Sequence, residues 1–550
     1  MKCYLPLLVS LMLTASAHAQ ERGYNLGAVP DSLKSNASVI IHLERTSLEV
    51  ESLEKAILKV KKVFTVLNEG GKEALVFNQY ATKYLSLEEV EIKVYYPDGT
   101  VKSKFKKKDL STVAVGEGLV DEGYVTYYEI TTATYPVTIE FNYEQKLRST
   151  LAFPDYRFIR SKESVIESSY TVKLPSSMEL RHKSRHSDLQ PLITEEGQFR
   201  LYKWSVANLA PLKDEVGGVA FNKRFPYVQI VSNQFSHYGF RGDLSSWKNF
   251  GRWINELYKG LDVLPPGRQE FFINLVKEVP GDREKVRRIY QYMQDNFRYV
   301  SIQLGIGGLR PFSATFTDQK KYGDCKALSN YMLAALGAVG IRSHVAIINA
   351  AYNQEPVDPA FPASDFNHVI LCVPGVKDSI WLECTSSTAA FGELGTFTEN
   401  RNALLITDNG GILVPTPESK ASTNTLSTTT HVKLNDDFSS RSETIIHSKG
   451  DYSEMMVAIL KENRDKQKEA LLSVFGYRQP DDFMLSPMAN AANNELTLEM
   501  SLRKFSEFNS GSKYFVKSRI SKMWSTKLPT GTAGNKTITF ISRLKKTIPL

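Results

Sequence analysis

The amino-acid sequence predicts a multidomain protein with an N-terminal antiparallel β-sandwich-like domain, a central α+β core and a C-terminal β-rich domain with one helix. Three patterns lead to this prediction. Short alternating strands and regular turns fill residues 36–235, helical periodicity begins near Asp243, and strand patterns return after about residue 418. A chain of 550 residues is long enough for about three domains with separate cores.

The expected boundaries divide the chain into four segments. These are a signal peptide over 1–19, an N-terminal β-rich domain over 20–235, a core with a helical lead-in over 236–415 and a C-terminal β-rich domain over 416–550. Lys2, an apolar run to about Leu13 and small residues ending at Ala19 indicate the signal peptide. That run is too short to span a bilayer, and no later apolar stretch is long enough. We therefore expect an exported protein, periplasmic or extracellular, without a transmembrane segment.

Individual elements follow from the local pattern. Strands of the N-terminal domain are expected at 38–43, 56–66, 91–96, 124–131, 137–143, 169–174 and 200–204. A helix beginning near Asp243 should bury Phe250 and Trp253, a short helix should follow Gly267, and Asp282 should cap a third. In the C-terminal domain, the pattern predicts strands at 422–432, 495–504 and 537–542 and one charged amphipathic helix over 452–475.

The net charge argues against a nucleic-acid partner. The chain has 68 basic and 60 acidic residues, a formal net charge of +8, which is mild for its length. Nucleic-acid binding needs a concentrated basic stripe. The one pronounced basic run, 102–108, follows the turn at 97–100 and is interpreted as a solvated hairpin strand, with contact to a phosphate or polyanion as the alternative.

The cysteine count excludes a disulfide scaffold. Removal of the signal peptide leaves Cys325, Cys372 and Cys384, an odd number, so at least one thiol should be unpaired. Large apolar cores must then hold the chain together. The sequence has no calcium loop of the D-x-D-x-D-G type and no H-E-x-x-H pattern, so no metal or other cofactor is expected.

One stretch, residues 322–329, is typical of a sharp turn that leads into a helix with a nucleophile at its start. Gly323 provides backbone freedom and Asp324 is a natural N-cap, which places Cys325 at the first helical position. Apolar residues then recur at steps of three and four until Gly340. Unsatisfied amides and the positive end of the helix dipole stabilise a thiolate, which is the reactive form of cysteine. Cys325 is therefore the candidate nucleophile.

A β-hairpin supplies the candidate partners of that thiol. Strand-like residues 365–373 and 378–385 flank a Pro-Gly turn, and a four-residue loop over 374–377 would place His368 directly opposite Glu383. Opposed residues share a face of the sheet, so the carboxylate could hold the imidazole while the second ring nitrogen faces away from it. A register slip of one residue would separate the pair. Cysteine, histidine and acid make a nucleophile, a general base and an orienting group.

These residues also carry a family resemblance. The runs concerned are G-G-L-R-P at 307–311, G-D-C-K at 323–326, N-H-V at 367–369 and W-L-E-C-T at 381–385. Over roughly 280–415 the chain resembles the bacterial transglutaminase-like superfamily. That resemblance implies a papain-like α+β core with a catalytic triad of Cys325, His368 and Glu383, although the wider family usually has Asp at the third position. The preceding region is similar to the uncharacterised domain that often precedes such cores in bacterial envelope proteins.

The expected activity is attack by Cys325 on an amide or acyl carbonyl through an acyl-thioester. The backbone N–H of Cys325 should donate to the oxyanion, and Gln319 or Gln303 is the candidate second donor. Attack by water makes an exported peptidase or amidase with a protein or peptide substrate, cell-wall peptides included. Attack by an amine makes a protein-glutamine acyltransferase. A further alternative is a non-catalytic envelope binding or assembly module that retains the triad residues.

Overall fold

The structure is a computed structural model of the 550-residue chain. It describes residues 24, 26–115, 120–121, 123–212, 225–303, 305–351, 355–375, 378–488, 495–511, 513–515, 520–521 and 545–547. The expected signal peptide over 1–19 and the expected strand at 537–542 lie outside the described residues. No helix in the described ranges has both the length and the apolar character needed to cross a bilayer.

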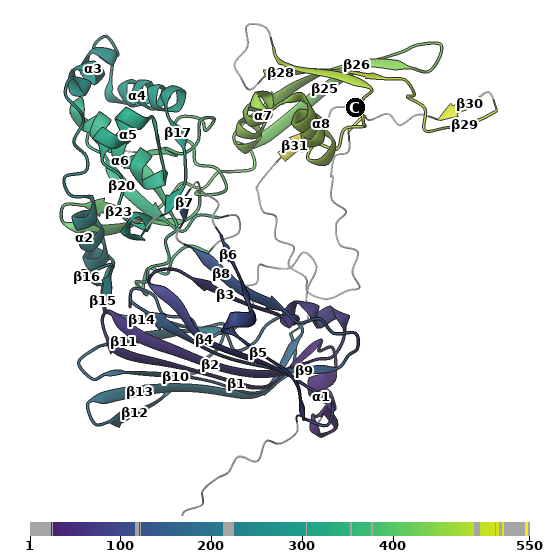
Figure 1. Ribbon diagram of the computed structural model, residues 1–550. Helices are drawn as coiled ribbons and strands as arrows, with labels where there is room; N and C mark the ends of the chain where they lie inside the picture. The colour runs from purple at the N-terminus through teal and green to yellow at the C-terminus, as the bar shows by residue number, and fades with distance from the viewer. Residues whose placement is uncertain are drawn as a thin grey trace, which may run out of the picture.

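The N-terminal β domain consists of a large sheet and a small one (Figure 1). The large sheet has the order β12 (Leu192–Glu196), β13 (Phe199–Leu209), β10 (Glu163–Pro175), β1 (Val39–Ser52), β2 (Lys55–Val66), β9 (Val137–Leu147), β4 (Leu85–Tyr95) and β5 (Val101–Lys106). The small one has the order β3 (Val76–Ala81), β8 (Tyr124–Glu129) and β6 (Ser111–Ala114). All these pairs are antiparallel except β1 with β10, which is parallel and departs from the fully antiparallel expectation.

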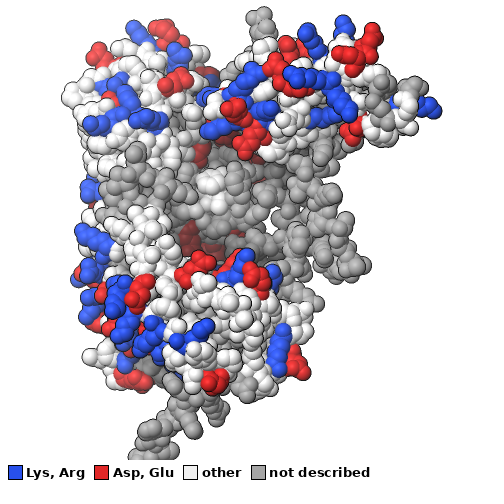
Figure 2. Space-filling model, turned by 45° about the vertical axis from the view of Figure 1, so that its right-hand side comes forward, with Lys and Arg blue, Asp and Glu red and all other residues white. Residues whose placement is uncertain are grey.

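Alternation along the strands gives the large sheet one apolar and one polar face. On β1, Leu48 and Val50 are buried in the core of the domain, whereas Arg45 and Glu49, at odd-numbered positions of the same strand, are exposed. The predicted basic hairpin strand is β5, at the edge of the sheet, and its lysines are exposed or partly exposed. Acidic and basic side chains are interspersed over the face of the molecule shown in Figure 2.

In its described residues the central region combines five helices with a five-stranded antiparallel sheet. The helices are α2 (Trp247–Tyr258), α3 (Arg268–Leu275), α4 (Asp282–Asn296), α5 (Ala314–Lys320) and α6 (Cys325–Ala338). The sheet order is β22 (Ile380–Leu382), β21 (His368–Val373), β20 (His344–Ile348), β23 (Asn402–Thr407) and β24 (Gly410–Pro415). Helix α6 lies at the centre of this core. The three predicted helices α2, α3 and α4 are present, but Gly281 is the N-cap of α4 and Asp282 is its first residue.

The C-terminal region is β-rich, as expected. Its five-stranded sheet has the order β27 (Asp482–Pro487), β28 (Glu495–Leu502), β26 (Ser440–Ser448), β25 (Thr425–Leu434) and β31 (Lys545–Thr547). The single helix expected over 452–475 is instead divided into α7 (Asp451–Lys461) and α8 (Arg464–Ser473). The division occurs because Asn463 has extended backbone geometry and its side chain accepts a hydrogen bond from Lys466 N, which makes it the N-cap of a new helix.

Two glycines let α2 approach the sheet at backbone contact distance. A Cβ atom added at Gly251 of α2 would lie 2.1 Å from the Gly411 nitrogen of β24. We expect Gly251→Ala to lower the stability of the central region by about 1–3 kcal/mol, because the helix must move away from the sheet. Urea unfolding of the full chain, followed by tryptophan fluorescence, measures this.

The matched control for this prediction is Gly337→Ala in α6. Gly337 is exposed and a Cβ atom there meets no neighbour within 4 Å. This substitution should leave stability unchanged or raise it by about 0.5–1 kcal/mol, because alanine is the better helix former. An equal loss in both variants would contradict the close packing of α2 against β24.

Candidate functional site

Cys325 is the first residue of α6, as the sequence predicted. The Asp324 side chain caps the helix, its Oδ1 accepting a hydrogen bond of 2.9 Å from Ala327 N. Gly323 belongs to a short strand, β19 (Tyr322–Gly323), that pairs in parallel with β17 (Arg298–Tyr299). The strand pair and the cap fix the turn on both sides of the thiol.

A buried ion pair flanks the cysteine, and sequence reasoning missed it. Lys326 Nζ lies 2.7 Å from Asp324 Oδ2, with only 4% and 2% of the two side chains exposed. Charges so far from water are stable only when paired, so each side chain holds the other in place. The run G-D-C-K places the two charges on either side of Cys325 and was the available signal.

His368 is the first residue of β21 and contacts Glu383, but not through the predicted register. The structure pairs Val373 with Ile380 rather than with Asp378, a shift of two residues. A shift of two keeps every side chain on its predicted face. Glu383, immediately after β22, is therefore a diagonal neighbour of His368 and not directly opposite it. Diagonal neighbours are farther apart than opposed residues, and the side chain of Glu, one methylene longer than that of Asp, spans this distance. His368 Nε2 lies 3.0 Å from Oε2 and 3.2 Å from Oε1 of Glu383.

Further hydrogen bonds hold Glu383 in this position. Thr385 donates to Oε1 from its backbone nitrogen at 3.1 Å and from its hydroxyl at 2.5 Å. The hydroxyl of Tyr290 on α4 donates to the backbone carbonyl of Glu383 at 2.9 Å. Sequence reasoning gave neither residue a role in the site. Thr385 lies within the W-L-E-C-T run, two positions after the acid, where a hydroxyl residue commonly bonds back to its neighbour.

The electrostatics favour a charged imidazole. Burial lowers the pKa of His368, but the charge of Glu383 and side-chain hydrogen bonds with Cys325 and Glu383 outweigh burial and raise the pKa well above its ordinary value. Burial raises the pKa of the Glu383 carboxyl, but the charge of His368 and hydrogen bonds from His368 and Thr385 outweigh it and hold the pKa low. The structure thus brings Cys325, His368 and Glu383 into one chain of contacts.

The other two cysteines are in surroundings that disfavour a thiolate. All three cysteines of the described chain are free and buried. Burial raises the pKa of Cys372 to about 11, and a hydrogen bond with Ser379 opposes it only in part. Burial raises the pKa of Cys384 further, and the charge of Glu383 adds to the effect. Neither thiol has an imidazole partner among the described residues.

Access to the thiol is narrow. Only 4% of Cys325 is exposed. Two exposed aromatic rings border the candidate residues. The pKa of Tyr299 is raised by burial and, to a smaller degree, by the charge of Cys325. The ring centroid of Phe397 is 5.7 Å from that of His368. Of the two candidate oxyanion donors, Gln319 is exposed on α5, and the side chain of Gln303 lies outside the described part of the chain.

The C-terminal region also reaches the site. Ser386, three residues after the candidate acid, donates a hydrogen bond of 3.0 Å to Glu454 of α7. Lys461, at the end of the same helix, donates to the carbonyl of Ser387 at 3.1 Å. The loop that leaves Glu383 is therefore tied to the C-terminal region.

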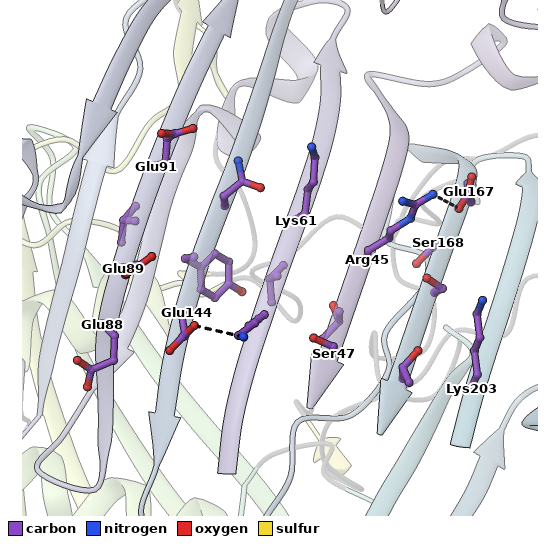
Figure 3. Close-up of a pocket in the computed structure, with 18 of the residues that line it drawn as sticks. Arg45, Ser47, Lys61, Glu88, Glu89, Glu91, Glu144, Glu167, Ser168 and Lys203 are labelled. Carbon is purple, nitrogen blue, oxygen red and sulfur yellow. Dashed lines mark hydrogen bonds and ion pairs between the residues drawn. The ribbon is translucent and has the colours of Figure 1, made fainter. Parts of the chain in front are cut away.

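A large hollow lies elsewhere and does not contain the candidate residues. It has a volume of about 1340 Å³ and lies on the polar face of the large N-terminal sheet (Figure 3). Its charges are largely matched, with Arg45 3.1 Å from Glu167 and Lys59 3.8 Å from Glu144. Its lining residues include no cysteine or histidine, so it contains no thiol–imidazole pair.

Substitution of Glu383 by Gln tests the coupling within the site. Without the carboxylate, burial should lower the pKa of His368, and the thiolate of Cys325 should lose its cationic partner. We expect alkylation of Cys325 by iodoacetamide at pH 6 to slow about tenfold or more, because a cationic partner favours the reactive form of a thiol. Mass spectrometry of the alkylated peptide from pH 5 to 9 measures the rate. A pH profile identical to that of the wild type would contradict the coupling.

Comparison with known protein families agrees with the fold. Residues 271–386 match the model of the transglutaminase-like superfamily. Residues 55–213 match the model of DUF3857, a domain of unknown function with solved structures. A search of curated proteins found no match.

Solved structures extend the comparison. A crystal structure of a candidate protease from Parabacteroides distasonis has a TM-score of 0.55 at 11% identity, covering 84% of this chain and 92% of that one. A candidate cysteine protease from Cytophaga hutchinsonii is 10% identical, and the match covers 66% of this chain and 81% of that one. Its TM-score of 0.18 is too low to indicate a shared fold. The first similarity shows a shared fold. The protein therefore belongs among those that join an N-terminal DUF3857 domain to a transglutaminase-like core.

Proposed function

We propose that the protein is an exported cysteine peptidase or amidase that acts through Cys325, His368 and Glu383. The observation that carries this proposal is the continuous contact from thiol to imidazole to carboxylate at the start of a buried helix. The transglutaminase-like core supports it, because a papain-like cysteine enzyme has this order of groups. The Parabacteroides protein with the same fold is described as a candidate protease, which fits a peptide substrate.

In the proposed mechanism, the Cys325 thiolate attacks the carbonyl carbon of an amide. The tetrahedral oxyanion accepts a hydrogen bond from the backbone N–H of Cys325, which is available because it is the first residue of α6. The imidazolium of His368 then donates its proton to the departing amine. Glu383 keeps the imidazole oriented, and water, deprotonated by His368, hydrolyses the resulting thioester.

Peptide profiling tests the proposed hydrolysis. Wild-type protein incubated with a peptide library should release new amino termini or amines, and Cys325→Ala should lower the rate at least about 10³-fold because no other group can form the thioester. Cys372→Ala is the matched control and should retain activity. Absence of any Cys325-dependent turnover, together with equally slow alkylation of all three thiols, would instead favour the non-catalytic module.

A second measurement separates hydrolysis from acyl transfer. We expect a labelled primary amine not to be incorporated into a glutamine donor, because export would place the site in water with no amine donor implied. Ammonia release is measured in parallel. Incorporation that outpaces hydrolysis at millimolar amine would make the protein an acyltransferase and overturn the hydrolase proposal.

A further inference from the structure

The N-terminal β domain contacts the segment next to the candidate nucleophile. Strand β7 (Val120–Asp121) of that domain pairs in parallel with β18 (Ile302–Gln303) of the central region. Two residues before β18, Val300 N donates a hydrogen bond of 2.9 Å to the carbonyl of Gly323, two residues before Cys325. The chain that borders the cysteine is thus attached to the N-terminal domain.

A second contact lies on the histidine side. Strands β11 (Leu180–Arg185) and β14 (Tyr227–Ser232) pair so that Lys183 lies opposite Gln229. Alternation then places Arg181, Lys183 and Arg185 on the face that carries Gln229. The other face of this ribbon is apolar and packs into the core of the N-terminal domain. This packing fixes the position of the ribbon and therefore of its polar face.

This polar face binds residues 358–362 of the central region. Arg185 Nη1 donates to Asp358 Oδ2 at 2.6 Å, and Lys183 is paired with the same carboxylate. Arg181 Nη2 donates to the carbonyl of Pro362 at 2.8 Å. The guanidinium of Arg181 also lies 5.0 Å from the centroid of the buried Phe361 ring, a cation–π distance.

Gln229 extends these contacts toward the candidate histidine. Its Oε1 accepts a hydrogen bond of 2.8 Å from Arg185 Nη2, and its Nε2 donates to Asp365 Oδ2 at 2.6 Å. The guanidinium can only donate, so the amide oxygen must face it and the amide nitrogen must face the carboxylate. Asp365 lies three residues before His368, and between them Asn367 makes two hydrogen bonds of 2.7 Å with the backbone of Ala350.

We propose that the N-terminal domain positions the catalytic histidine, with Gln229 and Arg185 holding the segment that ends at His368 at its correct distance from Cys325. This inference rests on the proposed function and adds to it that Gln229 is a positioning residue. Both segments that border the site are then fixed to one domain, so the distance between thiol and imidazole depends on that domain.

The electrostatics around Asp365 show what Gln229 contributes. Burial raises the pKa of Asp365, and the hydrogen bond from Gln229 and the charge of Arg185 oppose it. Burial also raises the pKa of Asp155 of the N-terminal domain to about 6, with Arg157 opposing and Asp365 adding to the effect. Two carboxylates from different domains therefore influence each other electrostatically beside Gln229 and Arg185. Without Gln229, Asp365 would lose the side-chain hydrogen bond that ties it to the N-terminal domain, and the segment before His368 would be free to move.

The test uses the full chain and two readouts: turnover of a peptide found by profiling, and the pH profile of Cys325 alkylation. Gln229→Leu should lower kcat about 10–100-fold with little change in KM, because a shift near 1 Å between reacting groups has an effect of that size. Alkylation of Cys325 at pH 6 should slow by a similar factor. Gln234→Leu, an exposed glutamine on β15 (Gln234–His237) of the same domain, is the matched control and should behave as wild type.

A swap of donor and acceptor separates positioning from general stability. Gln229→Glu alone places two carboxylates together and should impair both readouts, whereas Gln229→Glu with Asp365→Asn restores a hydrogen bond of reversed direction and should recover most of the loss. The comparison of the single and double variants tests the positioning role of Gln229 even if Gln229→Leu fails to fold.

The outcomes distinguish this inference from the proposed function. If the wild type turns over peptide and the folded Gln229 variants have the same kcat and the same alkylation rate, the positioning role is overturned. The peptidase proposal would still stand. A wild type without Cys325-dependent turnover would overturn the peptidase proposal, and the alkylation profile would still report on positioning. A double variant as impaired as Gln229→Glu would count against the inference.

Discussion

The pairing of His368 with Glu383 in a nearly dry environment is the interaction on which the site depends. Only 11% and 12% of the two side chains are exposed. An isolated charge at either position would be costly, so each group stays ionised only while the other is close and oriented. Thr385 supplies two more donors to the carboxylate, which leaves it little freedom to rotate. The raised pKa of His368 follows from this pairing and keeps a cation available for a thiolate.

Local rules were enough to predict the parts of the site that lie close together in sequence. Asp324 is a cap because its side chain meets the unsatisfied amide of Ala327, an interaction decided within three residues. The sequence also predicted that His368 and Glu383 lie on the same face of the sheet, because side chains alternate between the two faces along each strand. Their register could not, because the connection after Val373 is longer than the compact turn that the Pro-Gly pair suggested.

Contacts between distant residues gave no local signal. The parallel pairing of β1 with β10 joins Val39 to Glu163, and alternation alone does not distinguish parallel from antiparallel neighbours. The hydrogen bond from Gln229 to Asp365 joins residues 136 positions apart. Its two members look like ordinary polar strand and loop residues in the sequence. Gln229 is buried and its partner belongs to another domain, so only the folded chain reveals their contact.

The arrangement of the three regions follows from a conflict between reactivity and access. Burial strengthens the imidazole–carboxylate pair, but it also leaves 4% of Cys325 exposed. A core that opened widely would admit substrate and water together and would weaken the pair. Support from outside the core resolves this conflict. The N-terminal domain holds the segment before His368 through Gln229, and the C-terminal region holds the loop after Glu383 through Glu454. One support holds the chain before His368 and the other holds the chain after Glu383, so both ends of the hairpin that carries the charged pair are fixed.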